Sequence, residues 1–352
     1  MQFDTDYLRH LFESDYPLSV KGHPWQKAPT RLRLVHQSMR PSSVPRHSTV
    51  SILQATLVTL ALTLMGTGVH AQSIEPRAYT NIPIGMNFLI AGYAYTEGGL
   101  SVDPSVPLTN ANLQTHNTVL AYARSIDLWG QSGKFDVIVP YAWLSGDAEY
   151  AGQPVEREVS GFGAPLLRLS MNFIGAPALS IKAFSGYQQD LIVGGSLQVG
   201  GPSGQYDADK LVNIGSNRWF VKPELGVSKA WGPLALELAT AATIFGDNED
   251  FFGGHRLEQE PIYSLQGHLV YTFHSGIWAA LTGTYFTGGR TTVDGVTEND
   301  LQKTTRAGVT LALPVNRHHS IKFYASTGLS IRTGTDFDAF GAAWQYRWGE
   351  GS

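Results

Sequence analysis

The chain has 352 residues, of which 43% are hydrophobic and 15% charged, with 38 glycines and a formal net charge of −4. This charge is low for a soluble enzyme, in which about a quarter of the residues are charged, and a helical membrane protein would be far more apolar because each span needs about 20 nearly uncharged residues. The absence of cysteine excludes disulfides and thiolate metal sites. The sequence also lacks the basic stripe that would predict a nucleic-acid partner.

The front of the chain is predicted to be a leader that precedes the folded protein. Basic residues come before an apolar run over residues 50–65, and the small-residue site Val69-His70-Ala71 follows. This order is typical of a cleavable secretory signal peptide, and the run is too short to span a bilayer comfortably. The expected organisation is an upstream extension from a misplaced start codon at 1–38, a signal peptide at 39–71, and the mature protein at 72–352, beginning near Gln72.

From residue 87 onward, many stretches alternate apolar and polar residues with a period of two. In Leu234–Ile244 one face is mostly apolar, whereas Glu237 lies on the other face among small residues. Such alternation is typical of strands with one face on lipid and one on a lumen, and strands of about ten residues are long for a soluble β-sandwich. The expected strands are Asn87–Thr96, Thr115–Ile126, Phe135–Leu144, Gly163–Phe173, Leu191–Val199, Trp219–Val227, Leu234–Ile244, Tyr263–His274, Ile277–Phe286, Arg306–Leu313, Ile321–Arg332 and Phe340–Trp348. They predict an all-β fold, an antiparallel transmembrane β-barrel of about twelve strands in the bacterial outer membrane.

The connections between these strands alternate between short and long, as expected for periplasmic turns and outer loops. Expected short turns include Ala230–Pro233 and Pro314–His319, and expected long loops include Gly146–Glu156, Gly246–Gln259 and Gly288–Asn299. Gly175–Gln188 is long for a periplasmic turn and does not fit the alternation. The last predicted strand carries aromatic residues on one face close to the end of the chain, which fits the aromatic girdle of a barrel.

Eight charged residues fall on the polar faces of the predicted strands. An Arg or Lys that faced lipid near the bilayer midplane would cost about 2–4 kcal/mol, so these side chains are expected to face the lumen. They can form interstrand ion pairs that stiffen the wall, or they can line a pore. If the pore is open, the four basic residues of the last three strands should cluster on one wall, away from Glu224 and Glu237. The lumen-lining candidates are Arg168, Lys222, Glu224, Glu237, Arg306, Lys322, Arg332 and Arg347.

Candidates for catalysis and metal binding are weak. Ser264 and His268 share one strand face but lie roughly 13 Å apart at about 3.3 Å per residue, too far for a nucleophile and its base. His318 and His319 are adjacent, so on a strand end they point to opposite faces. The acidic run at residues 247–250 lacks the ligand spacing of a calcium loop. We therefore predict no catalytic residue, no metal site, no cofactor and no enzymatic activity.

Several motifs resemble those of the family named for the meta pathway of phenol degradation, over essentially all of residues 75–348. They are Glu75-Pro76-Arg77-Ala78-Tyr79, Pro83–Phe88, Val119–Leu128, Arg157–Ala164, Asn213–Lys229, Asn248–Gly254 and Leu265–Gly295, which contains Gly288-Gly289-Arg290-Thr291-Thr292. The resemblance implies a transporter-like outer-membrane barrel associated with aromatic degradation. It supplies no catalytic or binding residues.

The expected function is an outer-membrane channel for small aromatic or hydrophobic molecules, because a barrel of about twelve strands has little spare lumen. The expected partners are outer-membrane lipid and this cargo. Two alternatives stay open: a membrane-embedded enzyme that acts on lipid, and a structural or adhesive barrel that works through its outer loops. The sequence decides neither the oligomeric state nor whether the lumen is open.

Overall fold

The computed structural model of the protein describes residues 75–101, 108–150, 152–210, 212–331 and 334–349. The signal peptide and the upstream extension expected at residues 1–71 lie outside the described residues. Within the part of the chain that is described, no helix is long and apolar enough to cross a membrane.

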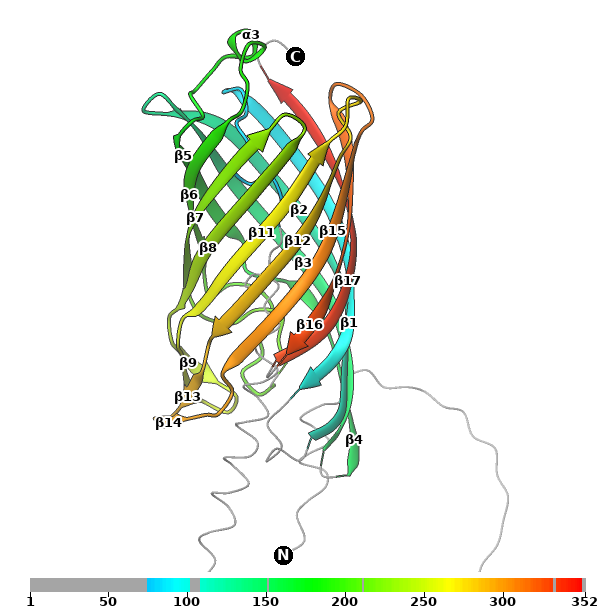
Figure 1. Ribbon diagram of the computed structural model, residues 1–352. Coiled ribbons are helices and arrows are strands. Elements are labelled where there is room, and N and C mark those ends of the chain that lie inside the picture. The colour runs from blue at the N-terminus through cyan, green and yellow to red at the C-terminus, as the bar shows by residue number, and fades with distance from the viewer. Residues whose placement is uncertain (1–74, 102–107, 151, 211, 332–333, 350–352) are drawn as a thin grey trace, which may run out of the picture.

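Twelve of the described strands close into an antiparallel barrel, as the sequence predicts (Figure 1). Each pairs with its neighbours in the barrel wall, and the first strand closes the ring by pairing with the last from Met86↔Gly349 to Ser101↔Gly334. The barrel strands are β1 (Met86–Ser101), β2 (Leu108–Leu128), β3 (Gln131–Tyr150), β5 (Leu166–Ile174), β6 (Leu191–Gly200), β7 (Phe220–Trp231), β8 (Leu234–Phe245), β11 (Ile262–Thr272), β12 (Trp278–Gly288), β15 (Gln302–Pro314), β16 (His319–Ile331) and β17 (Gly334–Gly349).

The barrel wall separates an apolar outer surface from a polar interior. In β8 the side chains of Leu236 and Leu238 are exposed on the outside, whereas Glu237 between them is only 3% exposed. In β11, Leu265 and Leu269 are likewise exposed and His268 is buried. Because leucine can face hydrocarbon and a carboxylate cannot, the alternation fixes which side of each strand faces lipid.

Aromatic side chains mark both rims of this apolar belt. Near the end with the short turns, the rings of Trp344 and Tyr346 stack with centroids 6.3 Å apart, and the Trp344 indole donates to Nδ1 of His319. At the other end, the rings of Tyr141 and Phe162 meet edge to face at 5.0 Å. Amphipathic rings prefer the boundary between hydrocarbon and water, so the two clusters bracket the membrane-spanning part of the wall.

The short turns gather at one end of the barrel, which by the usual asymmetry is periplasmic (Figure 1, top). The β2–β3 turn has two central residues, Trp129 with φ 54° and Gly130 with φ 80°. Positive φ at both positions is the geometry of a tight hairpin turn that matches the twist of its strands. The longer connection at residues 175–190 contains the short helix α3 (Ile181–Phe184), whose Ser180 side chain caps Ala183 N–H at 3.3 Å.

At the opposite end, several expected loops are in fact strands. The expected loop Gly146–Glu156 is a hairpin of β3 and β4 (Gln153–Phe162), in which Tyr141↔Phe162 to Tyr150↔Gln153 are paired. The expected loops Gly246–Gln259 and Gly288–Asn299 form a four-stranded sheet of β9 (Asn248–Phe251), β10 (His255–Gln259), β13 (Thr291–Val293) and β14 (Val296–Thr297). These strands extend beyond the bilayer, where lipid no longer imposes an alternating pattern that the sequence could show.

Candidate functional site

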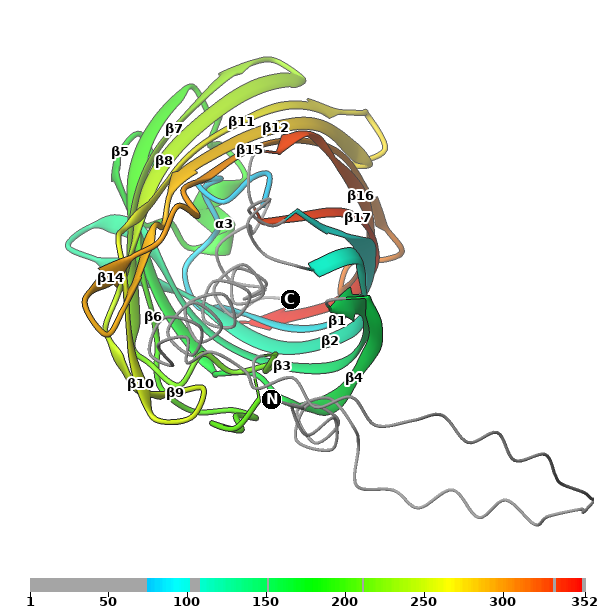
Figure 2. The same ribbon diagram turned by 90° about the horizontal axis from the view of Figure 1, so that it is seen from below.

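The interior of the barrel contains a segment of the protein's own chain. Residues 75–85, which precede β1, run inside the barrel wall (Figure 2, blue). We call this segment the plug. Its Tyr79 and Asn81 are 4% and 3% exposed. The plug was not predicted, because a segment without periodicity gives no strand or helix signal.

Hydrogen bonds to main-chain carbonyls fix the plug at its periplasmic end. Ile84 N–H donates to the Leu179 carbonyl at 2.9 Å, and the Asn81 amide donates to the Pro177 carbonyl at 3.3 Å. The Ser125 hydroxyl, on β2, donates to the Pro83 carbonyl at 2.6 Å. The connection at residues 175–190 therefore has a packing role, which explains its unusual length.

The first described residue of the plug forms an ion pair with the barrel wall. Oε2 of Glu75 lies 2.7 Å from Nη1 of Arg168, and Nε of Arg168 lies 2.8 Å from Oδ2 of Asp136 on the neighbouring strand. Lys134 follows, with its Nζ 3.7 Å from Oδ1 of Asp136. The predicted lumen residue Arg168 is thus the centre of a chain of charges that joins β3, β5 and the plug.

The two predicted acidic residues of the lumen also contact the plug. The Tyr79 hydroxyl donates to Oε1 of Glu224 at 2.8 Å, and Oε2 of Glu224 lies 3.6 Å from Nζ of Lys222. Arg77 N–H donates to Oε2 of Glu237 at 2.6 Å. A buried carboxylate needs such donors, so the plug supplies part of the hydrogen bonding of the wall.

The remaining predicted candidates are placed separately. Arg306 is 1% exposed; its Nη2 donates to the Phe337 carbonyl at 2.8 Å, and the guanidinium lies 3.8 Å from the centroid of the Phe337 ring. Arg347 donates from Nε to the Arg317 carbonyl at 2.7 Å, in the β15–β16 turn. Arg332 lies outside the described residues.

The strands that carry the expected basic cluster are neighbours, but the structure places Arg306 and Lys322 at different heights along the wall. Arg306 pairs with Gly328, whereas Lys322 lies six residues nearer the periplasmic end of β16. At about 3.3 Å per residue this is a separation of roughly 20 Å. Sequence order places these strands side by side, but only the register fixes the height of each side chain along the wall.

The cavity beside Glu75 and Tyr79 is small. The cavity lined by Glu75, Tyr79, Arg168, Lys222, Glu224 and His268 has a volume of about 30 Å³. This is room for little more than a water molecule, and it is too small for an aromatic ring. In the described arrangement, the plug blocks this part of the lumen to such a solute.

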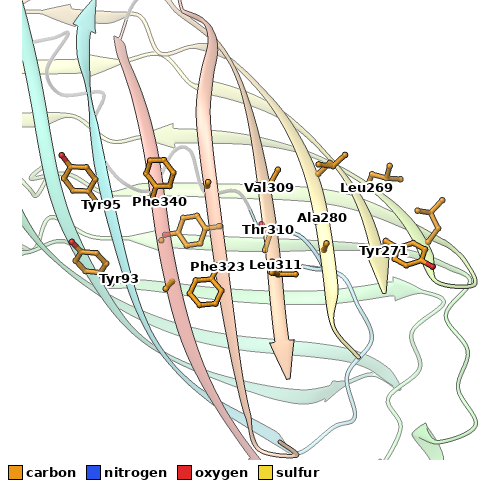
Figure 3. Close-up of a pocket in the computed structure, with 17 residues that line it drawn as sticks. Tyr93, Tyr95, Leu269, Tyr271, Ala280, Val309, Thr310, Leu311, Phe323 and Phe340 are labelled. Atoms are coloured by element: carbon orange, nitrogen blue, oxygen red, sulfur yellow. The ribbon is translucent and has the colours of Figure 1, made fainter. Parts of the chain in front are cut away.

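A much larger hollow, of about 820 Å³, lies on the outer surface of the barrel (Figure 3). Its lining includes Tyr93, Leu281, Phe323 and Phe340, of which Phe340 is 61% exposed. These side chains belong to the apolar belt, where bilayer hydrocarbon covers the wall. The candidate functional site is therefore the polar lumen with its plug, although the outer hollow is larger.

The weak catalytic and metal candidates have structural partners. Nδ1 of His268 lies 2.9 Å from the Thr282 hydroxyl, and His318 contacts the Arg347 carbonyl. In the acidic run, Asp247 and Glu249 pair with Arg256 at 2.5 and 3.4 Å. Among the described residues, no group of three or more His, Asp or Glu side chains could hold a metal ion.

A closed twelve-stranded barrel with an apolar belt, two aromatic rims and a polar, plugged interior defines the protein as an outer-membrane β-barrel. Residues 94–347 match the family described as "Putative MetA-pathway of phenol degradation", and because they make up well over half of the chain, the protein belongs to this family. The resemblance seen in the sequence is thereby confirmed.

Two solved structures show the same type of fold. An outer membrane channel from Pseudomonas putida F1 aligns with a TM-score of 0.68 at 20% sequence identity, over 78% of this chain and 100% of that chain. The transport unit of the autotransporter AIDA-I from Escherichia coli aligns with a TM-score of 0.50 at 8% identity, over 83% and 98% of the two chains. A comparison with curated protein sequences finds no significant match.

Proposed function

We propose that the protein is an outer-membrane channel for small aromatic molecules and that the plug controls passage through it. The observation that supports this proposal is the nature of the obstruction. Part of the lumen is occupied by a segment outside the barrel strands, which is held by side-chain and turn contacts, and such a segment can move without breaking the wall. The association of the family with phenol degradation supports an aromatic cargo.

The size of the barrel limits the cargo. Twelve strands leave a narrower lumen than the 16–18 strands of wide aqueous porins. With the plug in place, the cavity of about 30 Å³ does not admit a benzene ring. Passage through this part of the lumen therefore requires residues 75–79 to move away, and the narrow barrel then favours a small molecule.

The contacts of the plug indicate which side chains would line the channel once residues 75–79 have left the lumen. Once Glu75 and Tyr79 withdraw, Arg168 and Glu224 lose a partner each and face the free space. Lys222 and Glu237 lie beside them, and Lys322 is close enough to Glu75 to interact with its charge. We propose that these charged side chains orient a polar substituent of the cargo while its ring passes.

The test compares the purified mature barrel with a variant that lacks residues 75–79. Ion conductance is measured in planar bilayers, and uptake of phenol and of a disaccharide is measured in liposomes. The shortened barrel should conduct more strongly and should admit phenol faster than the parent, with little admission of the sugar. A shortened barrel that keeps heat-modifiable gel mobility but neither conducts nor admits phenol would refute the proposal. Equal admission of both solutes would refute the aromatic preference.

A further inference from the structure

The ring of Tyr79 lies against two glycines that are paired across β6 and β7. Gly194 and Gly226 are register partners. A Cβ added at Gly226 would lie 2.1 Å from Cε2 of Tyr79, and one added at Gly194 would lie 2.6 Å from its Cδ1. Distances this short are not tolerated between carbon atoms, so the ring fits only because both positions are glycine.

The other sides of the ring are enclosed by apolar side chains. Ile192 on β6 and Ala176 in the connection that precedes β6 are both fully buried and form a cluster with Tyr79. Ala239 on β8 packs against the same cluster. Gly194, Gly226, Ile192 and Ala176 therefore form a flat apolar slot on the inner wall, which we call the ring slot.

A carboxylate lies at the position of the hydroxyl, and the Ser196 hydroxyl lies beside it. Glu224 is two residues from Gly226 on the same face of β7, and its Oε1 accepts from the Tyr79 hydroxyl at 2.8 Å. Nζ of Lys222 lies 3.6 Å from Oε2 of the same carboxylate. Packing of a ring on glycines needs no hydroxyl acceptor, since phenylalanine would fill the same space. A flat slot with a carboxylate at its far end is complementary to a phenol.

The slot and its occupant come from different parts of the protein. The ring slot and Glu224 belong to the barrel wall and to a connection anchored at both ends, whereas Tyr79 belongs to the plug. We propose that the ring slot together with Glu224 binds the phenol ring of a cargo molecule, and that Tyr79 takes the place of this ring when the channel is closed. This inference rests on the proposed function, because it assumes that the plug leaves the lumen.

Competition between cargo and Tyr79 follows directly. A ligand shifts an equilibrium toward the state that it binds more tightly, so a free phenol should favour the state in which Tyr79 is out of the slot. Because Tyr79 is tethered, it competes at an effective concentration on the order of millimolar. Phenols should therefore open the wild-type barrel at millimolar rather than micromolar concentrations.

The test uses 4-methylphenol, which has the structure of the tyrosine side chain, and toluene, which lacks the hydroxyl. In Tyr79→Ala, calorimetry should show 4-methylphenol binding at least about tenfold more tightly than toluene, because a hydrogen bond to a charged group is lost with toluene. Adding Glu224→Gln should reduce this preference several-fold, since a charge-assisted hydrogen bond is stronger than a neutral one.

A second test fills the ring slot by adding a methyl group to its wall. In the Tyr79→Ala background, Gly226→Ala should abolish binding of 4-methylphenol. Gly283→Ala is the matched control, because an added Cβ there meets no atom within 4 Å. If Gly226→Ala prevents folding, as judged by heat-modifiable mobility, Ala239→Val replaces it, since Ala239 packs against the same cluster, whereas a Cβ at Gly194 would also meet the Met171 carbonyl oxygen at 2.9 Å. Equal binding of the two ligands, or binding that survives a filled slot, would overturn the proposal.

A recording on the wild-type barrel separates a cargo site from a pocket that serves the plug alone. Addition of 4-methylphenol should raise the open probability, and the same concentration of toluene should not. No rise would mean that the slot serves the plug alone. If the barrel without residues 75–79 passes phenol but no variant binds 4-methylphenol, the channel function stands and the ring slot is refuted. If 4-methylphenol binds but no barrel passes phenol, the channel function is refuted instead.

Discussion

Neutralising Glu75 should open the channel without weakening its wall. The Glu75 carboxylate is 37% exposed and lies 2.7 Å from Arg168, whose side chain is 15% exposed. In Glu75→Gln, Arg168 keeps its ion pair with Asp136 at 2.8 Å, so no buried charge is left unpaired. Glu75→Gln should therefore destabilise the closed state by less than the roughly 3–5 kcal/mol lost when a buried ion pair is broken. It should destabilise it by more than the fraction of a kcal/mol that an exposed ion pair contributes.

For this partly buried ion pair we expect an intermediate value, so the closed state should lose about 1–2 kcal/mol of stability relative to the open state. This corresponds to a rise of about 5- to 30-fold in the ratio of open to closed barrels. Because bulk salt screens a partly buried pair incompletely, the difference between wild type and variant should persist at 1 M salt, where the Debye length is about 3 Å.

Single-channel recording in planar bilayers measures this ratio as open probability. Glu97→Gln is the matched control, because it makes the same chemical change at an exposed position on β1. The Glu97 carboxylate accepts hydrogen bonds from Tyr95 and Gln114, which belong to the barrel wall and not to the plug. Glu75→Gln should raise the open probability and Glu97→Gln should not. An unchanged open probability in Glu75→Gln, with normal folding, would show that the ion pair does not hold the plug. Arg168→Gln is less suitable, because it leaves Asp136 and Glu75 without their shared cation.

Three further predictions follow from the wall, the outer loops and the leader. Leu238→Arg should block assembly, because an Arg that faces lipid near the midplane costs about 2–4 kcal/mol. Ala239→Arg should assemble but displace Tyr79, since Ala239 packs against the cluster that contains Tyr79. Heat-modifiable mobility measures assembly and conductance measures displacement of the plug, and equal loss of assembly in both variants would contradict the register. The pKa of Asp294 lies below its ordinary 3.8 because Arg256 N–H and then the His255 ring donate to the carboxylate. Its stabilisation of the β10–β13 contact is therefore present above about pH 3.8 and lost as the pH falls through the lower folded pKa. The distance between spin labels on β10 and β13 should stay constant from about pH 7 to about pH 5, and a change within this range would show that Asp294 does not control the contact. The mature protein should begin near Gln72, and N-terminal sequencing of the membrane fraction would contradict this if it found Met1 or Met39.

The wall of the barrel could be predicted from the sequence because lipid enforces a local rule. A charged residue such as Glu237 cannot share a face with Leu236 and Leu238 where hydrocarbon covers that face. This rule acts on consecutive residues, so it is visible in one dimension, and it predicted every strand of the closed barrel. Beyond the bilayer the rule no longer applies, and for that reason β4 and the four-stranded outer sheet were expected to be loops.

The interior could only be decided by the tertiary structure. Glu75 meets Arg168, and Tyr79 meets Glu224, across separations of 93 and 145 residues, and no local pattern encodes such contacts. The sequence assigned Arg168, Lys222, Glu224 and Glu237 to the lumen, but it could not show that the plug would engage them. The ring slot depends in the same way on Gly194 and Gly226, which look like ordinary strand glycines until the register sets them side by side beneath Tyr79. Which residues face inward is a local property of each strand, whereas what they bind there depends on how the closed chain brings distant segments together.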